Sequence, residues 1–213
     1  LYNETSSASL IKRLFTSECT WLQTSAISSK EENLPEAHFA NIFSKLAYTK
    51  LDKIVCVSSI VYNEQTIVFN HIDKNKFIKI NNGIDIKKFN RSERKQNNIF
   101  TIGFVGRISP EKGIIYLLNV LDTLKKRGYL FKFIIVGVAS TTAEVEYEKE
   151  VSNTISKLGI DTCRYGFQQN LSDIYSQLDI FILPSTGKEA FGLVLCEAMY
   201  FGIPVISTNT GGQ

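Results

Sequence analysis

The sequence predicts an α/β protein whose second half is a doubly wound parallel sheet. From Ile99 onward, short apolar runs alternate with longer segments that have helical spacing. The apolar runs, such as Phe131 to Val138, are continuous rather than alternating, which is typical of parallel strands buried on both faces. Two of them lead through loops, beginning at Gly106 and Ser185, into helices. Strand, loop and helix in this repeated order indicate a sheet with helices on both faces.

Before Ile99 the pattern predicts a smaller α/β region. A short amphipathic helix fits Leu10 to Phe15, with Trp21 and Leu22 on a further turn, and helical spacing returns between Ala37 and Ala47. A buried strand, a helix and a second strand follow, at Lys53 to Ser58, Val61 to Asn70 and Lys76 to Ile80. Asn90 to Asn98 is polar and aperiodic, so we predict a partial N-terminal α/β domain at residues 1–90, a linker at 91–98 and a second domain at 99–213.

The second domain is interpreted in the same way. Its predicted strands are Ile99 to Val105, Phe131 to Val138, Cys163 to Phe167, Asp179 to Pro184 and Pro204 to Thr208. Four helices are predicted. The first carries the apolar residues from Ile114 to Leu124 and ends before Gly128, and the second spans Ala143 to Leu158 and ends before Gly159. The third runs from a cap at Asn170 through Gln177, and the fourth begins near Phe191. The chain starts at Leu1 and stops at a Gly-Gly turn where a further helix should follow. We therefore expect a piece of a longer protein, with the second domain incomplete at its C-terminus.

Composition argues against several classes of protein. The 24 basic and 21 acidic residues are interspersed and leave a net charge of +3, which does not indicate nucleic-acid binding. The four cysteines are far apart and show no metal-ligand spacing, which favours reduced thiols and a cytoplasmic protein. No apolar run approaches the roughly 18–20 residues of a membrane-spanning helix. Peripheral membrane contact stays open, although no amphipathic basic helix indicates it.

The stretch from Ser185 to Glu197 follows a strand and opens a helix, which is where open α/β sheets bind ligands. The first N–H groups of a helix lack partners within it and attract anions. If the helix begins near Phe191, the amides of Phe191, Gly192 and Leu193 point outward, and Gly192 has no Cβ to keep a phosphate away. The sequence thus predicts an anion site at this helix start.

Two glutamates in this stretch, Glu189 and Glu197, are separated by seven residues. Glu189 precedes the helix, whereas Glu197 lies in the apolar run LVLCEAM, where a carboxylate must be hydrogen-bonded. Sugar and ribose hydroxyls are suitable donors to such carboxylates. A structural cap or pair explains Glu197 equally well, and the spacing alone does not decide between the two interpretations.

A second candidate anion loop runs from Gly106 to Gly113, with the sequence GRISPEKG. Arg107 offers planar, two-pronged donation and Lys112 a mobile point charge, a combination that suits a pyrophosphate. The order of residues is neither a Walker A loop nor a GxGxxG fingerprint. A plain turn with solvated charges explains this loop alone about as well. Both loops leave the same sheet edge, however, and together they favour a diphosphate ligand.

In this order the segments resemble the retaining glycosyltransferases of family 4, which have the GT-B architecture. The resemblance covers roughly residues 80–213. It is carried by INNGID…F at 80–89, FVGRISPEKGI at 104–114, FIIVG at 133–137, GF at 166–167, the pair of glutamates with FGL at 189–197, EAMxxGxPVIxT at 197–208 and GG at 211–212.

The resemblance implies a role for each matching residue. The diphosphate of a UDP- or GDP-linked sugar would be held by Arg107 and Lys112, helped by Gly106 and the amides of Phe191, Gly192 and Leu193. Glu189 would face the donor sugar and Glu197 the ribose, and the backbone at Gly166 and Phe167 would lie near the base. No metal is implied, since Arg and Lys supply the charge that stabilises the leaving group. The catalytic residues would be Glu189, Arg107 and Lys112, moving a hexose to a glycan or lipid-linked acceptor with retention of configuration.

The region before Ile80 departs from the family pattern. It lacks the glycine-rich loop of the family's N-terminal domain, and neither His38 nor His71 sits in a matching motif, so we assign neither a role. We therefore expect the 213-residue chain alone to transfer weakly or not at all. One alternative is a non-catalytic or partner-dependent nucleotide-sugar-binding domain, which the intact donor-site residues disfavour. Another is a sugar-nucleotide epimerase with GT-B architecture, which the pair of glutamates disfavours.

Overall fold

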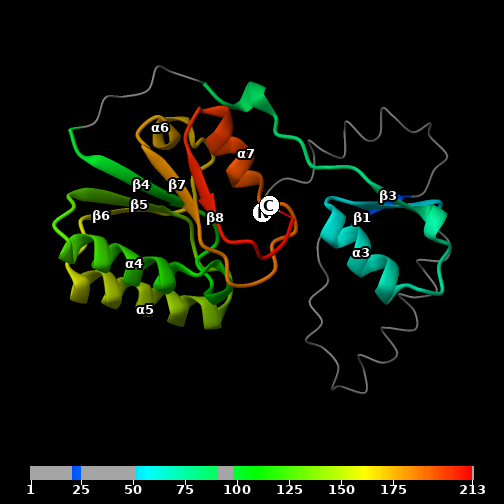
Figure 1. The fold of residues 1–213 in the computed structure, drawn as a ribbon, viewed down its shortest axis with the longest axis horizontal. Helices are drawn as coiled ribbons and strands as arrows, with labels where there is room; N and C mark the ends of the chain where they lie inside the picture. Colours follow the sequence, from blue (N-terminus) through cyan, green and yellow to red (C-terminus); the bar gives the residue numbers. More distant parts are fainter. Residues whose placement is uncertain (1–20, 25–50, 91–97, 213) are drawn as a thin grey trace. The chain divides into compact units, whose positions relative to one another are not determined.

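The computed structural model describes residues 21–24, 51–90 and 98–212. Their contacts divide them into two compact units. The first contains the described residues up to Gly83 together with Glu189–Phe191 and Gly212, and the second contains the remainder from Ile84 onward. Each unit is built on a parallel sheet (Figure 1), so the predicted α/β class, with a doubly wound second half, is confirmed.

The first unit has a three-stranded parallel sheet in the order β1-β2-β3. The strands are β1 (Trp21–Thr24), β2 (Lys53–Cys56) and β3 (Phe77–Lys79); helix α3 (Ser59–Val68) and the short turn η1 (Lys74–Lys76) join β2 to β3. Ser58 caps α3 by accepting a hydrogen bond from the amide of Val61 at 3.3 Å, so the helix begins before the predicted Val61.

The prediction that Trp21 and Leu22 lie on a helical turn is wrong. They belong to β1, in register with Lys53 and Ile54 of β2. A few apolar residues fit either period, and pairing with a distant strand decides the outcome. The helices predicted at 10–15 and 37–47 lie outside the described residues. The core of the first unit consists of Ile54, Cys56, Val57, Val61, Phe69, Ile72 and Phe77.

The second unit has a five-stranded parallel sheet in the order β6-β5-β4-β7-β8. The strands are β4 (Phe100–Val105), β5 (Phe131–Val136), β6 (Thr162–Tyr165), β7 (Ile180–Leu183) and β8 (Val205–Ser207). All five predicted strands are therefore present, each ending within two residues of its predicted end. The central pair β4 and β5 is in continuous register from Phe100 opposite Phe131 to Val105 opposite Val136.

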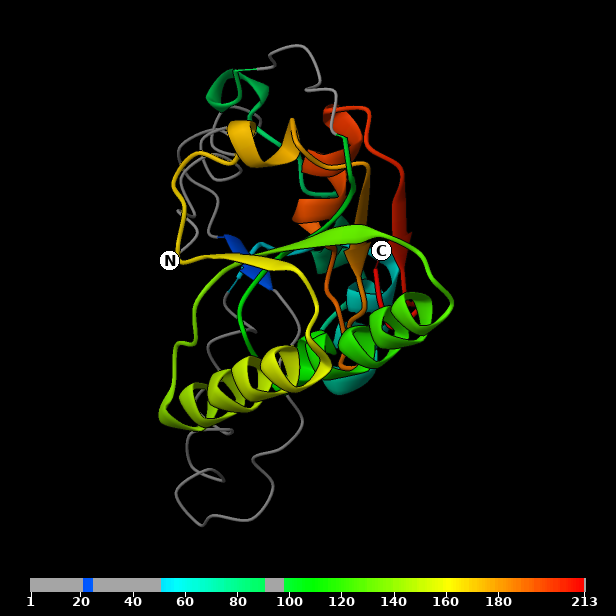
Figure 2. The ribbon, with the colours of Figure 1, turned by 90° about the vertical axis from the view of Figure 1, so that its left-hand side faces the viewer.

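Helices cover both faces of this sheet. The bounds are α4 (Ile114–Lys126), α5 (Thr142–Leu158), α6 (Ser172–Tyr175) and α7 (Leu193–Tyr200). Helices α4 and α5 lie on one face, and α6 and α7 lie on the other (Figure 1 and Figure 2). Gly159 ends α5 with a φ of 57°, as its position predicted. Helix α6 is shorter than expected. Just before this helix, the Asn170 side chain accepts a hydrogen bond from the amide of Ser172.

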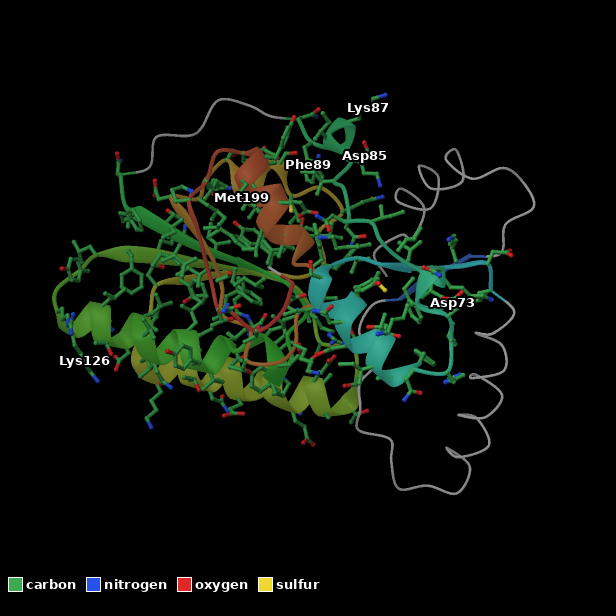
Figure 3. The ribbon with its side chains drawn as sticks, turned by 45° about the vertical axis from the view of Figure 1, so that its right-hand side comes forward. Asp73, Asp85, Lys87, Phe89, Lys126 and Met199 are labelled. Carbon is green, nitrogen blue, oxygen red and sulfur yellow. The ribbon has the colours of Figure 1, made fainter. Side chains whose placement is uncertain are left out.

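The segment that precedes the linker is anchored in the second unit. It contains the turn η2 (Ile86–Lys88), and its Phe89 ring packs edge-on against Phe201 at 5.6 Å between ring centroids, beside α7 (Figure 3). The amide of Asn90 donates to Ser172 Oγ at 3.0 Å. Residues 84–90 are therefore grouped with the second unit, although we predicted them in the first domain. The predicted linker lies almost wholly at 91–97, outside the described residues.

Candidate functional site

The strand order of the second unit creates a switch point between β4 and β7. The chain proceeds from β4 to β5 and β6 on one side, then returns to place β7 and β8 on the other side. The β4–β7 pair is in register at Ile102 opposite Ile180 and at Gly103 opposite Phe181. The loops that leave β4 and β7 therefore lead to helices on opposite faces of the sheet, α4 and α7, and the carboxyl ends of strands at such a switch point are where open α/β sheets bind ligands.

These two loops hydrogen-bond to each other. The amides of Thr186 and Gly187 donate to the Glu111 carbonyl at 2.8 and 3.0 Å. Gly113, with a φ of 68°, lies so close to the β7 loop that an added Cβ would stand 2.0 Å from the carbonyl oxygen of Pro184. Glycine is required there, because both the left-handed backbone and the close approach exclude a side chain. The two candidate anion loops are thus one connected structure.

Arg107 lies in the β4 loop and is held by two carboxylates. Its guanidinium pairs with Glu111, four residues on, and its Nε lies 3.3 Å from Glu144 Oε1. Glu144 belongs to the capping box that starts α5, where its other carboxylate oxygen accepts the amides of Ser140 and Thr141 at 2.7 and 3.2 Å. An anion that binds Arg107 must therefore share or replace these carboxylate partners.

Lys112 ends the short turn η3 (Pro110–Lys112), just before α4. It is half-buried, and its amide donates to the Ser109 carbonyl at 3.0 Å. Ser109 is fully buried, and within the described residues its hydroxyl has no hydrogen-bond partner. Both basic residues proposed for the diphosphate, Arg107 and Lys112, lie on this one loop, between β4 and α4.

The start of α7 differs from the prediction. The helix begins at Leu193, with Gly192 as its N-cap at a φ of 79°, rather than near Phe191. Gly192 adopts the left-handed conformation, which interrupts the helix before Leu193. Gly192 and Leu193 remain at the helix start. Phe191 precedes it and packs, with Ala190, against the core of the first unit.

Glu197 lies within α7 and only 5% of its surface is exposed. The Tyr175 hydroxyl donates a 2.8 Å hydrogen bond to its Oε2. Burial raises the pKa of Glu197 above its ordinary value, and the hydrogen bond from Tyr175 partly opposes this. The carboxylate thus has a structural partner that the sequence did not reveal.

The remaining predicted residues fall in different places. Gly166 and Phe167 follow β6 at the same sheet edge as the two loops, and Phe167 is 61% exposed. Glu189 is grouped with the first unit, where its carbonyl accepts the amide of Gly212 at 2.7 Å. The two glutamates of the pair therefore belong to different units. Of the two histidines, His71 lies near Phe69 in the first unit, and His38 lies outside the described residues.

Sequence reasoning overlooked Glu111, Glu144 and Tyr175 as neighbours of the site. A local signal exists for Glu144, because Thr141 and Glu144 have the spacing of a capping box. No local signal exists for Tyr175, which reaches Glu197 from 22 residues away. Within the ranges that the structure describes, no three His, Cys, Asp or Glu side chains gather in a way that could hold a metal ion. The helices of those same ranges include none that is long and apolar enough to span a bilayer.

Comparison with known proteins identifies the class to which this arrangement belongs. The family model for the glycosyl transferases group 1 matches residues 85–213, more than half of the chain. The chain therefore belongs to the glycosyl transferases group 1 family, and its fold is that of the GT-B glycosyltransferases.

Two curated relatives are bacterial transferases named for lipopolysaccharide and capsular polysaccharide. The lipopolysaccharide 1,2-N-acetylglucosaminetransferase of Salmonella typhimurium is 36% identical over 114 residues, which are 51% of this chain and 30% of that protein. The capsular polysaccharide biosynthesis glycosyltransferase CapM of Staphylococcus aureus is 28% identical over 186 residues, which are 80% of this chain and 47% of CapM. The chain thus spans half or less of the length of these relatives.

A solved structure of Anabaena HepE is similar over most of the chain. In complex with UDP-glucose, HepE superimposes with a TM-score of 0.65 at 25% identity, over 83% of this chain and 51% of HepE. Its complex with UDP gives a TM-score of 0.72 at 23% identity over 96% of this chain and 56% of HepE, which shows the shared fold.

Proposed function

We propose that this chain is part of a retaining glycosyltransferase of family 4. The enzyme moves a hexose from a nucleoside diphosphate sugar to a hydroxyl of a glycan or lipid-linked acceptor. The observation that carries the proposal is the direct contact between the two anion loops at the switch point, through the Glu111 carbonyl and the amides of Thr186 and Gly187. That contact joins the loop bearing two cations to the loop that leads into α7.

The donor's diphosphate binds to Arg107 and Lys112, with Gly106 and the amides at 191–193 as further donors. Arg gives two-pronged donation and Lys a point charge, and the amides at the start of α7 add the positive end of its dipole. Glu197 accepts hydrogen bonds from the ribose. The base lies near the backbone of Gly166 and Phe167, which share the sheet edge with the loops.

Catalysis in this proposal is mainly electrostatic. The bond between the sugar's anomeric carbon and the diphosphate breaks, and Arg107 and Lys112 stabilise the negative charge that develops on the leaving diphosphate. Glu189 hydrogen-bonds the donor sugar near the reacting carbon. The acceptor hydroxyl attacks from the face that the diphosphate leaves and gives its proton to the departing diphosphate oxygen, so the anomeric configuration is retained. No metal ion is needed, because the two side chains supply the positive charge.

The comparisons and the cysteines support the donor and the setting that we propose. A complex of HepE with UDP-glucose at 25% identity favours UDP over GDP as the nucleotide. The names of the two bacterial relatives favour a polysaccharide or lipopolysaccharide acceptor. Cys163 and Cys196 are free thiols, which fits a reducing, cytoplasmic environment. Peripheral contact with a membrane is part of the proposal for a lipid-linked acceptor only.

Calorimetric titration of the 213-residue chain with UDP, GDP, ADP and uridine tests the proposal. We expect UDP to bind more tightly than uridine, and EDTA to leave that affinity unchanged. Arg107→Ala and Lys112→Ala should each weaken UDP binding about tenfold or more, since hydrogen bonds to charged groups contribute about 1.5–3 kcal/mol. Uridine binding should stay within twofold in both variants.

A matched control is Lys126→Ala. It removes the same charge from the far end of α4, about 18 Å along the helix from its first residue, Ile114, which follows shortly after Lys112 (Figure 3). Lys126 is paired with Asp122 at 2.6 Å and should not affect UDP binding. Equal losses of UDP and uridine affinity in the Arg107 and Lys112 variants would overturn the phosphate assignment. Binding of UDP without transfer by the complete protein, supplied with UDP-sugars and glycan acceptors, would favour the non-catalytic alternative.

A further inference from the structure

Glu197 is a buried carboxylate with few hydrogen-bond donors around it to offset the cost of burial. Among the described residues, Tyr175 is the only side chain that hydrogen-bonds to its carboxylate, and no Lys or Arg forms an ion pair with it. A carboxylate has about four acceptor positions, and a buried one is costly unless further donors fill them. Oε2 receives the Tyr175 hydroxyl, whereas Oε1 receives no hydrogen bond from the described residues. Oε1 is not one of the buried side-chain atoms that lack a partner among the described residues, so it can be reached by a donor from outside the chain.

The ring of Tyr175 is packed among other aromatic rings. Its ring is fully buried and stacks on Phe201 at 5.2 Å between centroids, with an interplanar angle of 28°. Phe181 and Phe89 contact the same ring at 6.1 and 6.5 Å. Such packing fixes the ring, because a buried aromatic side chain cannot change rotamer without moving its neighbours. The hydroxyl has two acceptors in reach, Glu197 Oε2 at 2.8 Å and the Val194 carbonyl at 3.5 Å, and the carboxylate is the closer one. Tyr175 therefore fixes where Glu197 Oε2 lies.

We infer that Tyr175 is a positioning residue for nucleotide recognition: its hydroxyl occupies Oε2 of Glu197, so that Oε1 is presented to the ribose hydroxyls of the donor. The inference rests on the ribose role proposed above for Glu197. A neutral hydroxyl is suited to this task, since it orients the carboxylate without neutralising it. The full negative charge stays available to the ribose hydroxyls. An Arg or Lys in its place would compete with the ligand for the same oxygens.

Recognition of ribose is measured by comparing UDP with 2′-deoxy-UDP and 3′-deoxy-UDP on the 213-residue chain. The wild-type chain should bind UDP about tenfold more tightly than at least one deoxy analogue, because hydrogen bonds to a charged group are worth about 1.5–3 kcal/mol. Tyr175→Phe keeps the ring and removes only the hydroxyl. It should reduce that ratio to threefold or less.

Tyr147→Phe provides the matched control. Its hydroxyl lies in the same unit, is half-buried and accepts the amide of Ile115 at 3.2 Å, away from Glu197. It should leave the ratio of affinities at the wild-type value. Glu197→Gln tests the same contact between Tyr175 and Glu197 without disturbing the aromatic packing. It should lower the ratio of affinities as Tyr175→Phe does. Adding Tyr175→Phe to Glu197→Gln should then change the ratio no further, since the tyrosine acts only through the glutamate.

The outcomes separate the inference from the function on which it rests. A Tyr175→Phe chain that is less stable but keeps the wild-type ratio would make Tyr175 purely structural and overturn the inference. A wild-type ratio of one, with UDP still bound, would overturn ribose recognition by Glu197 and this inference with it, while leaving the phosphate site intact. Absence of UDP binding to the wild-type chain would overturn the donor site as a whole. If Tyr175→Phe does not fold, an unchanged ratio in Glu197→Gln overturns the inference.

Discussion

The guanidinium of Arg107 lies 3.3 Å from the carboxylate of Glu144, in a contact between the loop after β4 and the first turn of α5. Glu144 is only 9% exposed at its side chain and is fixed by two backbone amides. Glu111, the second partner of Arg107, is 48% exposed at its side chain and has more freedom to move. An arriving phosphate should therefore displace Glu111 and leave the contact with Glu144 in place.

Glu111→Gln should tighten the binding of UDP. The variant removes a competing negative charge but keeps the backbone carbonyl that receives Thr186 and Gly187. Exposed ion pairs contribute at most about 1 kcal/mol, so the gain should be up to about fivefold. Calorimetry measures it, with Glu146→Gln as a control that removes the same charge from an exposed position on α5. Weaker UDP binding in Glu111→Gln would contradict displacement of this carboxylate.

Gly113→Ala should destabilise the chain much more than Gly128→Ala. Both glycines have a positive φ, 68° and 87°, but an added Cβ at Gly113 would meet the carbonyl of Pro184 at 2.0 Å, and at Gly128 it would meet nothing within 4 Å. Gly128→Ala should cost about 1 kcal/mol from the backbone alone. Gly113→Ala should cost about 3 kcal/mol or more, because the two loops must separate. Urea unfolding measures both, and equal losses would argue against a tight contact between the loops.

Glu189→Gln should separate binding from transfer. The donor's diphosphate, ribose and base are assigned to other residues, so UDP affinity of the variant should stay within twofold of wild type. Transfer by the complete protein should be abolished, since the amide cannot supply the negative charge near the reacting carbon. Isothermal titration and a turnover assay measure the two quantities, with Glu146→Gln as the matched control. Full turnover in Glu189→Gln would remove Glu189 from the catalytic residues.

Glu197 should make stability depend on pH. Burial raises its pKa in the folded chain above the ordinary value of 4.5, so the folded state binds the proton more tightly than the unfolded state. The contribution of Glu197 to the free energy of unfolding should therefore fall as pH rises from about 4.5 through the raised pKa, by up to about 1.4 kcal/mol per pH unit. Glu197→Gln cannot titrate.

Urea unfolding of the wild-type chain and of Glu197→Gln across pH 4 to 8 measures this contribution. The stability of the wild type relative to the variant should decline as pH rises through the raised pKa of Glu197 and should level off above it. A relative stability that increases with pH would mean that the folded state favours the charged form. The burial of Glu197 would then be offset by more than the Tyr175 hydroxyl.

The strands and helices of the second unit were predictable because their signals are local. A continuous apolar run such as that of β5 and a glycine after a helix, as at Gly159, depend on neighbours in the chain. Local spacing failed where two periods fit equally well, as at Trp21 and Leu22. It also misplaced the start of α7, because the left-handed turn at Gly192 depends on the surrounding loop and not on helix-forming residues.

For the candidate site, the sequence by itself determined which residue types stand at the ends of which strands: Arg107 and Lys112 after β4, and the two glutamates after β7. Chemical type and order along the chain are sufficient for that. They are also sufficient to identify the family to which the chain belongs. Only the tertiary structure decided that Glu111 joins the two loops, that Glu144 holds Arg107, and that Tyr175 holds Glu197. These partners come from separate elements, and the strand order and the packing of the helices bring them within hydrogen-bonding distance.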